Sequence, residues 1–275
     1  TTEYLCLARY DDENDYFDFD ISTLMTSSNV EPGDLFRASD TNYLLGEQYL
    51  HKAIVLVLQE SDQASVGLVL NIPTADTYTL TTHQGRQVEF TIRYGGASGK
   101  NGQDPFLWLH CSRALRKVSI GSPLPNQGSS CSRIYLCTVN EVMEAIDLDL
   151  ASPGEFLLIQ GFTAWEKFQD EAGGMSGEIR AGHMRQVSSQ QAENIWSLLQ
   201  SQDCLTEQSL DRNLQTAFTA WALAGLNDKT EVNAEEYKNK KKVDDSDVSD
   251  VALADKALGV WMKIFLLGDA EYAPS

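Results

Sequence analysis

The sequence predicts a layered α/β domain, in which helices flank a mixed β-sheet, followed by a C-terminal helical extension. Two apolar runs at residues 53–58 and 66–70 are separated by a polar turn, a pattern typical of paired strands buried on both faces. Residues 77–82 and 88–94 alternate apolar and polar side chains around Gln84-Gly85, which indicates a hairpin. Strands covered by helices favour the layered architecture.

The other elements of the domain are shorter. Strands are expected at residues 34–38, 106–109, 134–138 and 156–159. Asn140 can cap a helix that runs through residue 147, and a second short helix is expected at residues 177–181.

Beyond residue 187 the apolar residues follow a helical period. Ser188 and Gln191 have the spacing of a capping box, and a second helix is expected from the stripe Leu210, Leu214, Phe218 and Trp221. We therefore divide the chain into an acidic arm (1–30), an α/β domain (31–204) and a helical extension (205–275) with a charged linker at about 227–250.

Composition limits the classes of function. The net charge of −19 disfavours nucleic acid as a partner, and the 42% of hydrophobic residues excludes global disorder. No apolar run reaches the ~20 residues of a membrane span, so attachment to a membrane would be peripheral at most. The five cysteines contain no C-x-x-C pair, so a zinc site or a thioredoxin-like motif has no support. No metal and no cofactor are predicted. Whether Cys131 and Cys137 pair is left open.

Both ends of the chain contain candidate partner-binding residues. The acidic arm interleaves carboxylates with Tyr16, Phe17 and Phe19, and it is either a loosely packed surface segment or a docking arm for a basic partner. A last helix at residues 251–267 is apolar around most of its circumference and contains Leu258, Trp261 and Phe265. It either folds back onto its own domain or docks on another protein or a membrane assembly.

Familiar catalytic motifs are lacking, but polar and glycine residues gather at predicted strand ends. The glycine-rich residues 95–100 fail as a phosphate loop because their spacing is one residue short and Asn101 replaces the required Ser or Thr. Asn71 follows an apolar strand directly, and its amide either holds a neighbouring loop or faces a ligand. The candidate residues of such a ligand groove are Asn71, Pro73, Gly95, Gly96 and His110.

The same segments resemble the AlgH/YqgE family of small bacterial proteins and their plastid relatives. The resemblance covers about residues 31–199. Its pieces, in order, are Pro32-Gly33-Asp34-Leu35, His51-Lys52-Ala53-Ile54-Val55-Leu56, Gly67-Leu68-Val69-Leu70-Asn71, Tyr94-Gly95-Gly96, Leu109-His110, Gly161-Phe162-Thr163-Ala164-Trp165 and Gly177-Glu178-Ile179. The family usually has Arg where this chain has Ile72, so a role that needs that cation is not carried over.

The resemblance implies a compact α/β fold and no generally established catalytic activity. Because the relatives include plastid proteins, we expect a location in the chloroplast, and the cytoplasm is the alternative. Removal of a transit peptide before Thr1 would agree with the chloroplast. We expect a non-enzymatic accessory protein that joins a larger assembly through its terminal extensions, with a photosynthetic membrane complex as the candidate host. The alternatives are a ligand-binding protein or enzyme that uses the groove near Asn71, Gly96 and His110, and a regulator that acts by protein contacts.

Overall fold

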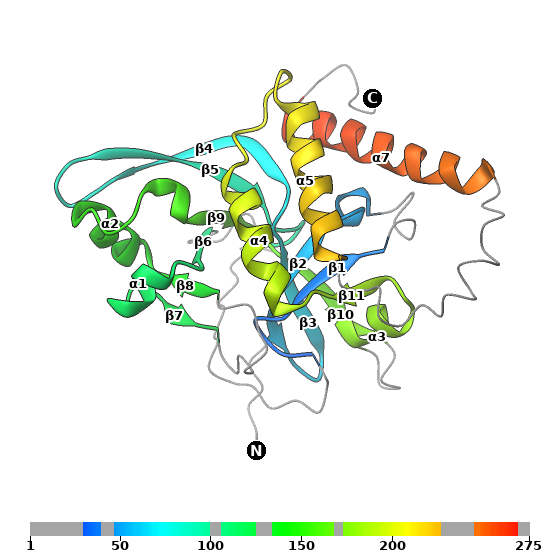
Figure 1. The fold of residues 1–275 in the computed structure, drawn as a ribbon, viewed down its shortest axis with the longest axis horizontal. Coiled ribbons are helices and arrows are strands. Elements are labelled where there is room, and N and C mark those ends of the chain that lie inside the picture. Colours follow the sequence, from blue (N-terminus) through cyan, green and yellow to red (C-terminus); the bar gives the residue numbers. More distant parts are fainter. Residues whose placement is uncertain are drawn as a thin grey trace, which may run out of the picture.

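The computed structural model describes residues 30–39, 47–99, 106–124, 134–167, 173–226 and 245–268, without the side chains of residues 189–190 and 245–249. Two β-sheets form the centre, and helices lie around them (Figure 1). This arrangement confirms the predicted mixed α/β class. The arm with Tyr16, Phe17 and Phe19, Cys131, and the linker at residues 227–244 lie outside the described residues.

The first sheet has five strands that are all antiparallel, in the order β10-β3-β2-β1-β11. The predicted buried hairpin is its centre: β2 pairs with β3, with Leu56 opposite Leu68, and every residue of both strands is buried. The bounds of the strands are β1 Leu35–Ala38, β2 Ile54–Glu60, β3 Ala64–Val69, β10 Thr163–Glu166 and β11 Met184–Gln186.

The second sheet has six strands in the order β4-β5-β9-β6-β8-β7. The hairpin predicted around Gln84-Gly85 is confirmed as β4 and β5, and the parallel pairing of β5 with β9 makes this sheet mixed. The sequence did not predict that the strands divide between two sheets. The bounds are β4 Pro73–Thr81, β5 Gln87–Tyr94, β6 Phe106–His110, β7 Ser122–Pro123, β8 Tyr135–Cys137 and β9 Leu157–Gln160.

The glycine-rich turn after β5 joins the two sheets. The Gly95 N–H donates to Gln160 O at the end of β9, while Gly95 O accepts from Val69 N at the end of β3. A Cβ on Gly96 would lie 2.0 Å from the carbonyl carbon of Phe162, so only glycine permits this approach of two backbones.

Short helices cover the sheets. The bounds are η1 Gln48–Leu50, α1 Arg113–Lys117, α2 Val139–Asp147, η2 Pro153–Glu155, α3 Gly174–Arg180, α4 Ser189–Gln200 and α5 Leu210–Ala224. Helix α2 buries Val142, Ala145 and Ile146 in one apolar cluster with residues of the second sheet. Helix α4 buries Ile195 and Trp196 in a cluster with β2 and β3, and α5 lies beside it (Figure 1).

Two helix starts differ from the sequence prediction. The cap of α2 is Thr138 and not Asn140, because Thr138 and Glu141 form a reciprocal capping box two residues earlier. Helix α4 does begin after Ser188, but the Ser188 hydroxyl contacts the Gln191 side chain and does not cap the backbone.

The last helix, α7 (Asp245–Leu266), packs on its own domain. It begins within the predicted linker and ends one residue before the predicted end. Of the two alternatives for this helix, the structure therefore shows folding back in cis. Among the described residues, no helix is long and apolar enough to cross a membrane.

Candidate functional site

The side-chain amide of Asn71 is hydrogen-bonded at both ends to the backbone of its own domain. Its Oδ1 accepts from Ile54 N at 2.9 Å, its Nδ2 donates to Lys52 O at 2.9 Å, and the side chain is buried. These bonds fix the start of β2, where Lys52 has a positive φ of 52°. The amide therefore holds a neighbouring loop, which is the first of the two roles considered for it.

His110 lies in the second sheet and is fully buried. Its Nδ1 accepts from Ser112 N at 3.1 Å, so the ring is the tautomer in which Nε2 carries the proton and donates to Ile120 O at 3.0 Å. Burial lowers the pKa of His110, which keeps the ring neutral. The ring also stacks on Tyr135, with the centroids 5.4 Å apart.

The predicted groove residues do not share one set of contacts. Pro73 is the first residue of β4 and pairs with Arg93, while Gly95 and Gly96 form the joint between the sheets. The hydrogen bonds of Asn71 end on β2, and those of His110 end next to α1 and β7. Whether any of these residues contacts a ligand stays a prediction.

Arg93 is a buried cation that the sequence interpretation missed. Its Nη1 donates to Gln202 Oε1 at 2.6 Å, and Nη2 donates to Leu199 O at the end of α4. Burial lowers its pKa to about 10. Arg93 stands between Ile92 and Tyr94 in β5, so alternation places it on the opposite face from these two apolar residues and gives no sign that it is buried. Nothing in the local sequence predicts its partner 109 residues away.

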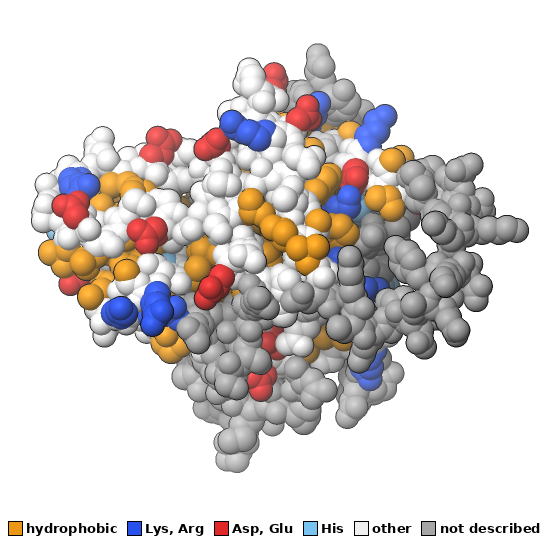
Figure 2. Space-filling model, in the orientation of Figure 1, with side chains coloured by type: hydrophobic (Ala, Val, Ile, Leu, Met, Phe, Trp, Pro, Cys, Tyr) orange, Lys and Arg blue, Asp and Glu red, His pale blue; other side chains and the backbone are white. Residues whose placement is uncertain are grey.

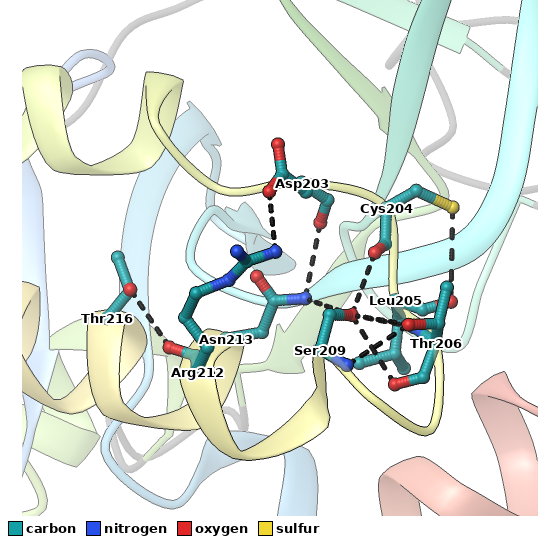
Figure 3. A network of polar contacts seen from close by, with 8 residues as sticks. All are labelled: Asp203, Cys204, Leu205, Thr206, Ser209, Arg212, Asn213 and Thr216. Carbon is teal, nitrogen blue, oxygen red and sulfur yellow. Dashed lines mark hydrogen bonds and ion pairs between the residues drawn. The ribbon is translucent and has the colours of Figure 1, made fainter.

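A network of polar contacts holds the turn between α4 and α5 (Figure 3). Thr206 N donates to Ser209 Oγ at 2.8 Å, and Ser209 N donates to Thr206 Oγ1 at 3.0 Å, which is a reciprocal cap. Asn213 Nδ2 bonds Asp203 O, and Arg212 forms an ion pair with Asp203 at 2.7 Å. Figure 3 shows these side chains converging on one turn.

Helix α5 places two aromatic rings over two cations, Arg37 of β1 and Lys52 just before β2. The Lys52 Nζ lies 4.2 Å from the ring centroid of Phe218, and the Arg37 guanidinium lies 5.0 Å from that of Trp221. Trp221 Nε1 also donates to Ala38 O at 2.6 Å. Helix α5 is thereby tied to the end of the first sheet at which β1 finishes and β2 begins, beside the residues His51 and Lys52 that bond α7.

The inner face of α7 closes an apolar cluster. Ala254, Leu258 and Met262 are each no more than 2% exposed, and the latter two pack in the cluster that contains Val55 and Val69. Trp261 meets the rings of Tyr49 and Tyr94, with centroids 5.9 and 5.1 Å away. Leu258 and Trp261, both predicted to bind a partner, therefore contact their own domain.

One polar contact locates α7 along this surface. Asp255 Oδ1 accepts from His51 Nε2 and from Lys52 Nζ, both at 2.7 Å, and we call this set the Asp255 latch. Partial burial acts to raise the pKa of Asp255, but the hydrogen bonds from Lys52 and His51 outweigh it and hold the pKa below its usual value.

The opposite side of α7 faces away from the domain. Leu253 and Val260 are 57% and 37% exposed, and Lys256 and Lys263 beside them are also exposed. At 3.6 residues per turn these four side chains follow one line along the helix, which we call the outer stripe. Figure 2 shows hydrophobic and basic side chains close together where Figure 1 draws α7. Phe265, another predicted partner residue, is 66% exposed at the end of the helix.

The described cysteines have little thiolate character. Burial raises the pKa of Cys111 and of Cys137 to about 12 each, and it also raises that of Cys204. Both Cys111 and Cys137 have free thiols. Within the residues that the structure describes, no group of three or more His, Cys, Asp or Glu side chains could hold a metal ion.

Comparison with known proteins gives a family match over most of the core. A family model described as AlgH-like matches residues 40–206. No curated protein matches the chain. Helices α5 and α7 lie beyond the matched residues.

Two solved structures are similar to part of the chain. One is protein DIP2367 from Corynebacterium diphtheriae, with 14% identity, coverage of 59% of this chain and 78% of that chain, and a TM-score of 0.37. The other is the AlgH protein from Pseudomonas aeruginosa, with 16% identity, coverage of 59% and 80%, and a TM-score of 0.35.

Proposed function

The chain belongs to the AlgH-like family, as its motifs predicted, and on that premise we propose that it is a non-enzymatic accessory protein that joins a larger protein assembly through its extensions. The α/β domain would hold α7 in place by packing against its inner face. The outer stripe of α7 would then be the surface that contacts the partner.

The single observation behind this proposal is the exposure of the outer stripe. Leu253 and Val260 place large apolar side chains in solvent on a helix whose other face is already fully packed. Lys256 and Lys263 add two positive charges to this stripe, on a chain whose net charge is −19. A partner surface with apolar groups and carboxylates would match both features.

The polar residues of the core support the same proposal. Asn71 uses both ends of its amide within the fold, and His110 uses both ring nitrogens. A general base or a ligand-binding amide needs a free polar atom in reach of its substrate. To take such a role, each of these side chains would first have to break two buried hydrogen bonds.

Affinity purification of the tagged full-length chain from the source organism tests the proposal. The test variant carries Leu253→Glu and Val260→Glu, and the matched control carries Val118→Glu and Leu148→Glu, two residues that are 50% and 57% exposed elsewhere on the surface. We expect recovery of specific partner proteins to fall about tenfold in the test variant only, because interface burial of one such side chain accounts for roughly 1.5–3 kcal/mol. Equal recovery from both variants would contradict the proposal.

We also propose that the protein resides in the chloroplast and that its host is a photosynthetic membrane complex. The support is the resemblance to plastid relatives. Fractionation of cells into cytosol and chloroplasts, and of the chloroplasts into stroma and thylakoid membranes, tests both parts when the chain is detected in each fraction. Recovery in the cytosol alone would contradict both parts, and recovery in the stroma alone would contradict the membrane host.

A further inference from the structure

Strand β4 has the longest open edge in the described part of the two sheets. It has nine residues and ends the second sheet, where it pairs with β5. The other terminal strands, β7, β10 and β11, have two, four and three residues, and β7 contains Pro123. Figure 1 shows the hairpin of β4 and β5 projecting at the margin of the molecule. An open edge of this length offers backbone hydrogen-bonding groups to another strand.

The register of the hairpin shows which backbone groups face the open edge. Thr82 N donates to Arg86 O at 2.9 Å, so the backbone of Thr82 faces β5. The pairing of β4 with β5 is continuous from Thr77 to Thr81. Because the direction of the backbone groups alternates along an antiparallel strand, the N–H and C=O groups of Thr77, Thr79 and Thr81 point towards the open edge.

The described residues cover only the start of this edge. Leu205 N donates to Thr74 O at 2.8 Å, and Cys204 Sγ donates to Ala75 O at 3.0 Å. Beyond Ala75, the described part of the chain makes no hydrogen bond with the open edge of β4. The side chains of the three threonines with outward backbone groups are also exposed.

The sequence of the open edge complements itself. Residues 77–82 read TYTLTT, which combines high β-propensity with the absence of charge and of proline, a composition typical of segments that pair with their own copies. In an antiparallel pair of two copies centred on Thr79, each Thr77 lies opposite a Thr81, and each Tyr78 lies opposite a Leu80. No charged side chain opposes another within these five residues.

The same register satisfies the outward backbone groups. The residues with outward groups face one another in it, so three residue pairs exchange both of their N–H···O bonds. On the inner face, the ring of Tyr78 already lies 5.1 Å from that of Phe106 and 5.9 Å from that of Trp108, but Tyr78 is only half-buried. Leu80 of the partner subunit extends this apolar cluster across the contact.

We propose that two copies of this chain associate through β4, antiparallel and centred on Thr79, so that their second sheets form one continuous sheet. Each copy uses the same edge, so the contact is isologous and the association stops at two copies. The net charge of −19 opposes association, but in roughly 0.15 M salt the screening length is about 8 Å, so charges far from the contact act weakly. The inference goes beyond the proposed function and uses no residue of α7.

Sedimentation equilibrium of the purified full-length chain in about 0.15 M salt tests the association. We expect a dimer with a dissociation constant on the order of 10–100 µM, because three hydrogen-bonded residue pairs and a small apolar contact make a weak interface. Thr79→Pro removes an outward N–H and leaves the bonds to β5 intact, since an edge strand tolerates proline at such a position. It should raise the dissociation constant at least about tenfold.

The matched control is Thr79→Val, which keeps the N–H and the size of the side chain and should leave the dissociation constant unchanged. Circular dichroism verifies that both variants are folded. A wild-type chain that stays monomeric at about 0.5 mM would overturn the inference and would leave the edge to a strand of another protein. Equal dissociation constants of the proline and valine variants would overturn it too.

Two charge variants test the register without proline. Thr77→Lys with Thr81→Lys places lysines opposite lysines in the dimer, and Thr77→Glu with Thr81→Glu places carboxylates opposite carboxylates, so each variant alone should dimerise at least about tenfold more weakly. Native mass spectrometry of their equal mixture should show the mixed dimer well above its statistical share. A statistical distribution of dimers would rule out this register. None of these measurements involves the outer stripe, so failure here and failure of the proposed function are distinguishable.

Discussion

Substitution of Asp255 by Asn should release α7 from the domain more often. Asn has the shape of Asp but lacks its charge, and the change therefore weakens the bonds from His51 and Lys52 without leaving a cavity. Lys52 keeps its contact with Phe218, so the core beneath the helix should stay folded.

The magnitude follows from the burial of the three side chains. Hydrogen bonds to charged groups contribute about 1.5–3 kcal/mol when buried, whereas exposed ion pairs contribute about 0.2–1 kcal/mol. The side chains of His51 and Lys52 are 1% and 10% exposed, but that of Asp255 is 32% exposed. An intermediate loss of about 1–2 kcal/mol is expected, which corresponds to about a fivefold to thirtyfold rise in the opening equilibrium.

Hydrogen exchange measured by mass spectrometry on residues 254–266 reports this opening directly. Asp250→Asn is the matched control, because Asp250 lies on the same helix and is exposed. The reasoning is refuted if the two variants exchange at the same rate over these residues.

The lowered pKa of Asp255 also predicts how the docking of α7 depends on pH. The pKa of Asp255 is lowered in the folded state, so its contribution is fully present above the unfolded value of about 3.9. The contribution is lost as the pH falls through the lowered folded value. The exchange rate of wild-type α7 should therefore rise towards that of Asp255→Asn only in strong acid.

Three further changes test the core by urea unfolding. Asn71→Ala leaves a buried N–H and a buried carbonyl without their partner and should cost about 2–4 kcal/mol; an unchanged midpoint would contradict the clamp role. Gly96→Ala should cost more than about 3 kcal/mol because its Cβ would overlap the backbone of Phe162, whereas the control Gly154→Ala, with no atom within 4 Å, should be nearly neutral. The lowered pKa of His110 predicts that stability declines as the pH falls below about 6.5, the unfolded value, and a midpoint that is flat from pH 8 to pH 5 would argue against it.

The hairpins could be predicted because their signals are local. The continuous apolar runs of β2 and β3 predict strands that are buried on both faces. The alternating pattern of β4 and β5 predicts strands that are buried on one face only. The cap at Thr138 is also visible in the sequence, since Thr138 and Glu141 have capping-box spacing, which is a stronger signal than the lone Asn140.

The division into two sheets and the position of α7 depend on contacts between distant residues. Gly95 joins β3 to β9 through bonds to Val69 and Gln160, and no local pattern specifies either partner. Asp255 lies 204 residues from His51, so neither periodicity nor motif spacing indicates that they meet. Sequence alone identified the apolar faces of α7 and could not say which of them the domain covers.

Binding of a partner by the outer stripe of α7 can be measured inside the cell. A photo-reactive amino acid at position 260, introduced into the full-length chain in the source organism, tests it most directly, with position 118 as the exposed control. We expect an adduct of discrete mass with another protein from position 260 and none from position 118. Failure of position 260 to form such an adduct, or the same adduct from both positions, would contradict it.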